Sequence, residues 1–164
     1  MNTVFETENI KFIELTELLV QDYLEMINDI NVARLLGRTK TVTEEGELNW
    51  IRMNLENKAP VFSMIEKSSG KFIGNIELMD VHDEEAELGI TITASMQDKG
   101  YGTESVPAIV DYGMKELNLK RIFLRVFPNN LRAIHVYEKC GFSEYGRTDE
   151  DLLMEIMITD DNKL

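Results

Sequence analysis

The apolar residues of this chain recur at two spacings, one typical of strands and one typical of helices. Short β-branched and aromatic runs between turn residues predict strands at 9–15, 61–66, 72–79, 87–93 and 121–127, from 142, and at 152–158. Spacing of three and four residues behind Thr or Asn caps predicts helices at 16–28, 43–57, 103–117 and 130–140. This order predicts an α+β (mixed α/β) fold, with a central mixed sheet of six to seven strands flanked by helices.

Connections between these elements add detail to the predicted topology. The strands at 61–66, 72–79 and 87–93 form an antiparallel meander, with turns at 68–71 and 83–85, whereas residues 31–41 are expected as a connector. A crossover helix at 103–117 makes the strand at 121–127 parallel to the one before it. Pro107 fits only near a helix start, so a helix that begins well before Thr103 is expected to kink. The first two helices should bury an apolar stripe that includes Leu18, Leu19, Tyr23, Met26, Ile27, Leu48, Ile51, Met53 and Leu55.

Length and composition favour a single soluble domain over residues 1–164. The chain has no apolar run long enough to cross a bilayer, and its first residues lack the features of a secretory signal. The lone Cys140 cannot form an intrachain disulfide, which favours a cytoplasmic setting. A formal net charge of −13 argues against nucleic acid as a partner and favours a cationic one, although acidity can also serve solubility alone.

A glycine-bearing loop between a strand and a helix is the first candidate site. Gly100 and Gly102 permit a tight turn and a close backbone approach, and Thr103 is placed to cap the following helix. Free amides at a helix start attract anions, so the loop is suited to a phosphate or diphosphate. The third glycine of a dinucleotide fingerprint and the Gly-Lys-Ser/Thr of a Walker loop are both missing.

Two motifs together resemble a known family. Gln97-Asp98-Lys99-Gly100-Tyr101-Gly102 fits Gln/Arg-x-x-Gly-x-Gly, the acyl-CoA diphosphate loop of the GNAT superfamily of N-acetyltransferases. Residues 130–142 resemble its second signature, Asn-x-x-Ala-x-x-x-Tyr-x-x-x-Gly-Phe, which places Asn130, Ala133 and Tyr137 close to one helix face. The resemblance covers about 9–158 and is greatest to the group with ribosomal-protein N-terminal and spermidine N-acetyltransferases. The chain departs from that group at Ile10-Lys11 and in a short, acidic segment from Ser143 to Asp151.

The resemblance implies a GNAT-like acyl-CoA N-acyltransferase fold and a site for acetyl-CoA, without a metal. The strand backbone at Ile90, Thr91 and Ile92 would pair with pantetheine, and an amide near Ile92 would polarise the thioester carbonyl. Tyr137 would protonate the departing thiolate, unless it is simply a packed aromatic. The cofactor contacts that the resemblance implies are Ile90, Thr91, Ile92, Gln97, Asp98, Lys99, Gly100, Tyr101, Gly102, Thr103, Asn130, Ala133 and Tyr137.

A general base is useful because the amine must react in its neutral form. Glu87 is the first candidate, directly or through water, since strand alternation places it on one face with Gly89 and Thr91. A carboxylate at a strand start can equally be solvated or paired. Glu77 on the preceding strand is the second candidate, and His82 is the third because we expect it in a turn.

The sequence therefore predicts an enzyme that transfers an acetyl group from acetyl-CoA directly to a primary amine. The acceptor is a polyamine or small amine, a protein N-terminus or an aminoglycoside-like compound, and a homodimer is possible. The alternative is a CoA-binding protein without catalysis, acting as a sensor or a structural partner.

Overall fold

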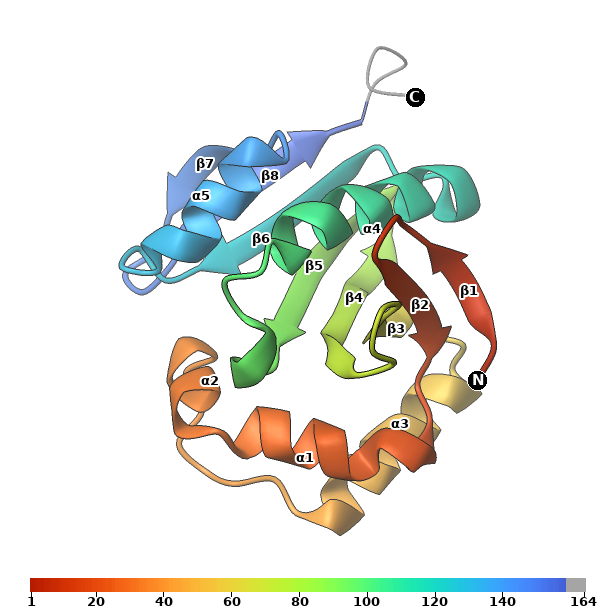
Figure 1. Cartoon of the computed structure of the whole chain (residues 1–164). Helices are drawn as coiled ribbons and strands as arrows, with labels where there is room; N and C mark the ends of the chain where they lie inside the picture. Colours follow the sequence, from red (N-terminus) through yellow and green to blue (C-terminus); the bar gives the residue numbers. More distant parts are fainter. Residues whose placement is uncertain (159–164) are drawn as a thin grey trace. The chain divides into compact units, whose positions relative to one another are not determined.

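A computed structural model describes residues 1–158 as two compact units. The first comprises residues 1–77 and 90–101, and the second comprises residues 78–89 and 102–158. Two long strands, β4 (Phe72–His82) and β5 (Glu85–Ile92), each contribute a part to both units. Figure 1 shows the elements of each unit along the chain.

Antiparallel strands build the first unit. Its strand order is β1-β2-β3-β4, where β1 is Thr3–Glu6, β2 is Ile10–Glu14 and β3 is Val61–Glu66. The predicted hairpin of β3 and β4 is confirmed, with Phe62 opposite Ile76. Strand β1 is absent from the prediction. It is held by Phe5, whose ring stacks on Phe12 with centroids 4.3 Å apart.

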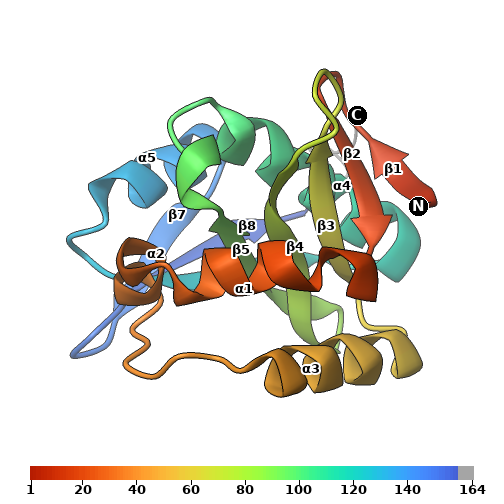
Figure 2. The ribbon, with the colours of Figure 1, turned by 60° about the horizontal axis from the view of Figure 1, so that its bottom comes forward.

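Three helices and two 3-10 turns complete the first unit: η1 (Glu17–Leu19), α1 (Val20–Asn28), α2 (Ile30–Leu35), α3 (Glu44–Glu56) and η2 (Ala94–Met96). Figure 2 shows α1 and α3 side by side, in agreement with the contacts between them. Their buried faces join the strands in one apolar cluster. That cluster contains Ile13, Leu15, Val20, Tyr23, Met26, Val32, Ile51, Val61, Ile65 and Phe72.

Several helix predictions for this unit need correction. The helix expected at 16–28 begins with a 3-10 turn, and the expected connector at 31–41 contains α2. Leu18, Met53 and Leu55 are exposed rather than part of the buried stripe, with Leu18 at 82%. A tighter 3-10 turn places side chains three residues apart above one another, which rotates Leu18 out of the helical stripe.

The second unit holds a mixed set of strands in the order β5-β6-β8-β7. The predicted parallel pairing of β5 with β6 (Arg121–Val126) is confirmed, with Glu87 opposite Phe123. Strand β8 (Leu152–Met157) runs antiparallel to β6, and β7 (Ser143–Arg147) pairs with β8, as Figure 1 shows. The helices of the second unit are α4, which ends at Leu117, and α5 (Leu131–Lys139).

Helix α4 (Tyr101–Leu117) begins two residues before the expected start, so the prediction that Thr103 is its N-cap is wrong. Pro107 then lies inside the helix and cannot donate to a carbonyl four residues earlier. The carbonyl left without that donor belongs to Thr103, and the Cys140 Sγ lies 3.8 Å from it as a weak donor. Cys140 thus compensates for the proline.

The described residues contain eight strands, one or two more than predicted, and the fold class is confirmed. Within residues 1–158 no helix combines the length and the apolar character that crossing a bilayer requires.

Candidate functional site

The end of β5 and the loop after it lie in the first unit. An ideal Cβ on Gly74 of β4 would lie 2.0 Å from the Thr91 carbonyl oxygen, so only glycine fits beside this part of β5. The Thr93 amide donates to the Ile73 carbonyl at 2.9 Å. The backbone predicted to pair with pantetheine, at Ile90 to Ile92, is therefore fixed against β4.

Gln97 closes the loop with its side chain. Its Nε2 donates to the Ile92 carbonyl at 3.0 Å, and its backbone amide donates to the Ala94 carbonyl at 3.3 Å. Next in the loop, Asp98 (φ 62°) and Gly100 (φ 84°) both adopt the left-handed backbone region. Alternation of left- and right-handed residues turns successive amides toward one side, which is the geometry of an anion-binding nest.

The start of α4 continues this loop. The first-turn amides of an α-helix have no carbonyl within the helix to accept them, and in α4 these include the amides of Gly102 and Thr103. They carry the positive end of the helix dipole. The loop and helix start therefore present backbone amides suited to an anion, and diphosphate binding here stays a prediction in which Thr103 contributes through its backbone rather than as a cap.

Tyr101 ties the loop to the β3–β4 hairpin, a contact that the sequence analysis missed. Its hydroxyl donates to Glu66 Oε2, while Ser69 Oγ donates to the other carboxylate oxygen at 2.5 Å. The hydrogen bonds from Ser69 and Tyr101 lower the pKa of Glu66. Glu66 therefore stays ionised at neutral pH and holds the tyrosine in place.

We expect Tyr101→Phe to weaken acetyl-CoA binding about fivefold, because the loop loses its hydrogen bond to the hairpin. Isothermal titration with CoA measures the change. Glu66→Gln should weaken binding in the same direction, and the double variant should be no worse than Tyr101→Phe alone. A Glu66→Gln protein with unchanged affinity, beside a weakened Tyr101→Phe protein, contradicts the anchoring role and points to a direct contact of the hydroxyl.

Tyr137 lies on α5 in the second unit. The residue is 9% exposed, and its ring packs on Phe142 with centroids 5.9 Å apart. Its hydroxyl has no hydrogen-bond partner among residues 1–158, yet no buried side-chain oxygen or nitrogen there lacks one. The hydroxyl oxygen must therefore reach solvent. Burial of the ring raises the pKa of Tyr137 to about 12, so the phenol is protonated at neutral pH.

Asn130 caps α5, as the sequence predicts. Its Oδ1 accepts from the Ala133 amide at 3.2 Å, which leaves the side-chain NH₂ as the group that can donate to a ligand. Ala133 is half-buried. Three residues of the second signature, Asn130, Ala133 and Tyr137, thus lie on one short helix of the second unit.

The first candidate base has a cationic partner. Glu87 on β5 accepts from Arg125 Nε at 3.0 Å, and the side chain of Glu87 is only 13% exposed. Hydrogen bonding to Glu87 raises the pKa of Arg125. Arg125 on β6 is a second residue that the sequence analysis missed, because only the parallel register places it beside Glu87.

The other two candidate bases differ in position and chemistry. Glu77 on β4 lies opposite Val61 and is half-buried. His82 is the last residue of β4 rather than part of a turn, which corrects its predicted place. The contact of its ring Nδ1 with the Asp80 carbonyl, at 2.6 Å, raises the pKa of His82 and makes the neutral, basic form less abundant at neutral pH.

A buried hydrogen-bond chain orients one further polar residue of the first unit. The Thr16 amide donates to the Tyr23 hydroxyl at 3.3 Å, that hydroxyl lies 2.6 Å from Ser63 Oγ, and Ser63 donates to Asn75 Oδ1 at 2.7 Å. With its oxygen used in this way, Asn75 on β4 presents an NH₂ donor. In the part of the chain that the structure describes, no cluster of His, Cys, Asp or Glu is placed to hold a metal ion.

Comparison with known proteins adds three findings. A family model described as an acetyltransferase (GNAT) domain matches residues 10–143. The uncharacterized N-acetyltransferase YnaD of Bacillus subtilis is 31% identical over 77% of this chain and 74% of its own length. A spermidine N(1)-acetyltransferase of Vibrio cholerae is 33% identical over 56% of this chain, and the match spans 54%, about half, of that relative's length.

Solved structures agree on the fold. A crystal structure of spermidine N-acetyltransferase from Vibrio cholerae, in complex with CoA and spermine, matches with a TM-score of 0.84 at 22% identity, over 92% of this chain and 96% of that one. A GNAT-family acetyltransferase from Bacillus anthracis matches with a TM-score of 0.81 at 23% identity, over 93% and 96%. Identities this low establish the fold alone. Because the family model matches most of its length, the chain belongs to the GNAT acetyltransferase family.

Proposed function

We propose that the chain transfers an acetyl group from acetyl-CoA directly to a primary amine. Membership of the GNAT family supports the reaction class. In the loop from Gln97 to Thr103, the amides after Gln97 bind the diphosphate, because the Gln97 amide already donates to the Ala94 carbonyl. Pantetheine pairs with the backbone at Ile90, Thr91 and Ile92, and it contacts the Asn130 amide and Ala133. One amide near Ile92 stabilises negative charge on the thioester oxygen.

The reaction joins the amine nitrogen to the thioester carbonyl carbon and breaks the bond from that carbon to sulfur. The cationic acceptor first loses one proton to a base and becomes the neutral amine that attacks. The nitrogen loses a second proton, to solvent, as the amide forms, and the leaving thiolate gains one proton. Tyr137 supplies the proton that the thiolate gains from its phenol. A phenol is an adequate acid here because the burial that raises the pKa of Tyr137 to about 12 also raises the pKa of a thiol formed beside it.

The state of the Tyr137 hydroxyl is the observation that supports this role most directly. A merely structural tyrosine would satisfy its hydroxyl inside the protein, as Tyr23 does with Ser63 at 2.6 Å. Tyr137 instead keeps a protonated hydroxyl that reaches solvent and has no partner within residues 1–158, at the end of a buried ring. Such a group is ready to donate to a ligand atom.

Glu87 accepts the amine proton, directly or through a bound water. Its ion pair with Arg125 fixes the position of the carboxylate. A carboxylate that is only 13% exposed favours approach of a cationic amine and then accepts one of its protons. Glu77 and His82 remain the alternatives.

The acceptor is a cationic amine of the polyamine type. The net charge of −13 favours such a substrate, and relatives named spermidine N-acetyltransferases support it. The same charge disfavours nucleic acid, and the free, half-buried Cys140 fits a reducing cytoplasm. A homodimer is the proposed active form.

A panel of amines tests the proposal. We expect acetyl-CoA turnover with spermidine and spermine, weaker turnover with mono-amines, and little with a peptide that has an acidic N-terminal sequence. Release of free CoA thiol, with mass spectrometry of the acetylated amine, measures the rate and the product. Tight CoA binding without acetylation of any amine contradicts the proposal and leaves a CoA sensor.

A further inference from the structure

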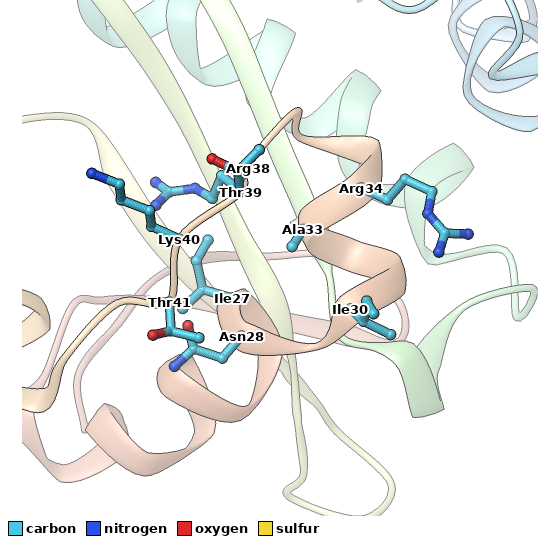
Figure 3. A pocket seen from close by; sticks show the side chains of 9 residues that line it. All are labelled: Ile27, Asn28, Ile30, Ala33, Arg34, Arg38, Thr39, Lys40 and Thr41. Atoms are coloured by element: carbon cyan, nitrogen blue, oxygen red, sulfur yellow. The ribbon is translucent and has the colours of Figure 1, made fainter.

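A pocket lies in the first unit where α1 meets α2 and the loop after it. Its volume is about 380 Å³, which is within the range of small-molecule sites. Figure 3 shows Arg38 and Lys40 leaving the loop on the same side in this view, while Arg34 extends from the other side of α2. The lining residues are Ile27, Asn28, Ile30, Ala33, Arg34, Arg38, Thr39, Lys40 and Thr41.

Hydrogen bonds fix the loop at both ends. Asn28 holds its far end, since the Asn28 Nδ2 donates to the Val42 carbonyl at 2.9 Å and the Oδ1 accepts from the Val42 amide at 2.8 Å. At the near end, Gly37 turns the chain with a φ of 70°, and the Arg38 amide donates to the Ala33 carbonyl at 2.8 Å. A backbone held in this way orders the pocket before any ligand arrives.

The charge around this pocket is unlike that of the rest of the chain. Acidic residues outnumber basic ones 30 to 17 overall, whereas residues 30–43, which lie between Asp29 and Glu44, contain Arg34, Arg38 and Lys40 and no Asp or Glu. All three cationic side chains are exposed. An acidic protein that concentrates three exposed cations at one cavity produces a local positive potential there.

These cations also lack internal partners. Within residues 1–158, Arg34, Arg38 and Lys40 form no ion pair with a carboxylate, in contrast to four other arginines. Those four are Arg52, Arg121, Arg125 and Arg147, which pair at 2.6 to 3.0 Å. Arg38 interacts electrostatically with the Glu47 carboxyl group. Burial raises the pKa of Glu47, and the positive charge of Arg38 lowers it. Since none of the three side chains is held in an ion pair with a carboxylate of the described residues, they remain available to an anion from outside.

We propose that this pocket binds a phosphate group of a small molecule, held by Arg38 and Lys40 with Arg34 at the rim. A guanidinium presents paired N–H groups that match two phosphate oxygens, and a lysine adds a point charge. Thr39 and Thr41 bring hydroxyl donors to the same lining. Three positive charges favour a multiply charged phosphate over a single carboxylate. The phosphate belongs either to a separate ligand or to the 3′-phosphate of CoA, and the test separates these sources.

The first arm uses the full chain saturated with CoA, so that the glycine loop is occupied. Pyrophosphate is titrated in at constant ionic strength, and binding is measured by calorimetry and by backbone amide NMR shifts. If the ligand is separate, wild-type protein binds, the shifts centre on residues 28–42, and Arg38→Gln/Lys40→Gln lowers affinity roughly tenfold or more. The control, Arg147→Gln/Lys115→Gln, removes the same charge from exposed ion pairs elsewhere and should change affinity less than about twofold.

The second arm compares CoA with dephospho-CoA on the protein without added pyrophosphate. If the pocket takes the 3′-phosphate, Arg38→Gln/Lys40→Gln weakens CoA roughly tenfold and leaves dephospho-CoA unchanged. Circular dichroism of each variant checks that it is folded, and the NMR arm uses wild-type protein alone. No pyrophosphate binding in the first arm, together with equal effects on CoA and dephospho-CoA in the second, overturns the proposal. The proposed acetyl transfer would stand in that case, since the pocket plays no part in it.

Discussion

Tyr137→Phe should lower kcat by roughly a hundredfold or more while leaving the affinity for acetyl-CoA nearly unchanged. The substitution removes a hydroxyl that is protonated at neutral pH, because burial raises the pKa of Tyr137 to about 12, and that has no partner among residues 1–158. The aromatic contact with Phe142, at 5.9 Å between ring centroids, survives. The decrease in kcat therefore reflects slower protonation of the leaving sulfur. Single-turnover kinetics with spermidine measures it.

Folding supplies the first control for this variant. Because the hydroxyl makes no hydrogen bond within the described residues, its removal should change the free energy of unfolding by less than about 1 kcal/mol. Tyr145→Phe, which alters an exposed tyrosine on β7, should leave kcat near the wild-type value. An unchanged single-turnover rate in Tyr137→Phe removes the phenol from the mechanism.

The pH dependence carries a second control. An acid with a pKa of about 12 stays protonated through the alkaline range that enzymes tolerate. The wild-type rate should therefore show no falling limb from Tyr137 between pH 8 and pH 10, where an unperturbed tyrosine begins to ionise. A falling limb with an apparent pKa near 10 that disappears in Tyr137→Phe contradicts the burial argument.

Local signals in the sequence predicted the parts of this protein that depend on neighbouring residues. Asn129 or Asn130 was predicted as a helix cap, and the structure shows that it is Asn130, whose side chain accepts from the Ala133 amide at 3.2 Å. The parallel pairing of β5 and β6 followed from the crossover helix between them, and the register confirms it. The cap depends on residues three positions apart. The parallel pairing depends on a single strand–helix–strand crossover, which is almost always right-handed.

Features that depend on distant parts of the chain escaped prediction. Strand β1 carries no alternation of its own and is held by Phe5 against Phe12 and Phe62, at 4.3 and 5.2 Å between centroids. Helix α2 has only six residues, too few for a periodic pattern, and its Asp29 cap accepts from the Asn31 and Val32 amides. Neither β1 nor α2 can be predicted from the sequence without knowing the tertiary contacts or the cap that stabilise it.

The start of α4 shows how a turn overrides a capping preference. Thr103 is a good N-cap residue by type. The left-handed turn at Asp98 and Gly100 ends earlier, however, and lets the helix begin at Tyr101. The chemistry predicted for this loop survives the shift because it belongs to backbone amides and does not depend on which side chain caps the helix.

Gly74→Ala should destabilise the protein by about 3 kcal/mol and lower its melting temperature by roughly 6 to 12 °C. The new Cβ would lie 2.0 Å from the Thr91 carbonyl oxygen and 2.9 Å from the Ile92 Cα. Both neighbours are backbone atoms, so a side-chain rotation cannot relieve the clash, and β5 itself must shift. The shifted residues are those that we propose pair with pantetheine, and acetyl-CoA affinity should fall together with stability.

Gly146→Ala on β7 is the matched control, because it is the same change in another strand. Its Cβ would meet only Leu153 Cδ1, at 3.7 Å, which is ordinary contact with a flexible side chain. Its melting temperature should stay within about 3 °C of wild type. Calorimetry and CoA titration of both variants separate the two effects. If Gly74→Ala loses stability but keeps wild-type affinity for CoA, then the Thr91–Ile92 backbone is structural and pantetheine binds elsewhere.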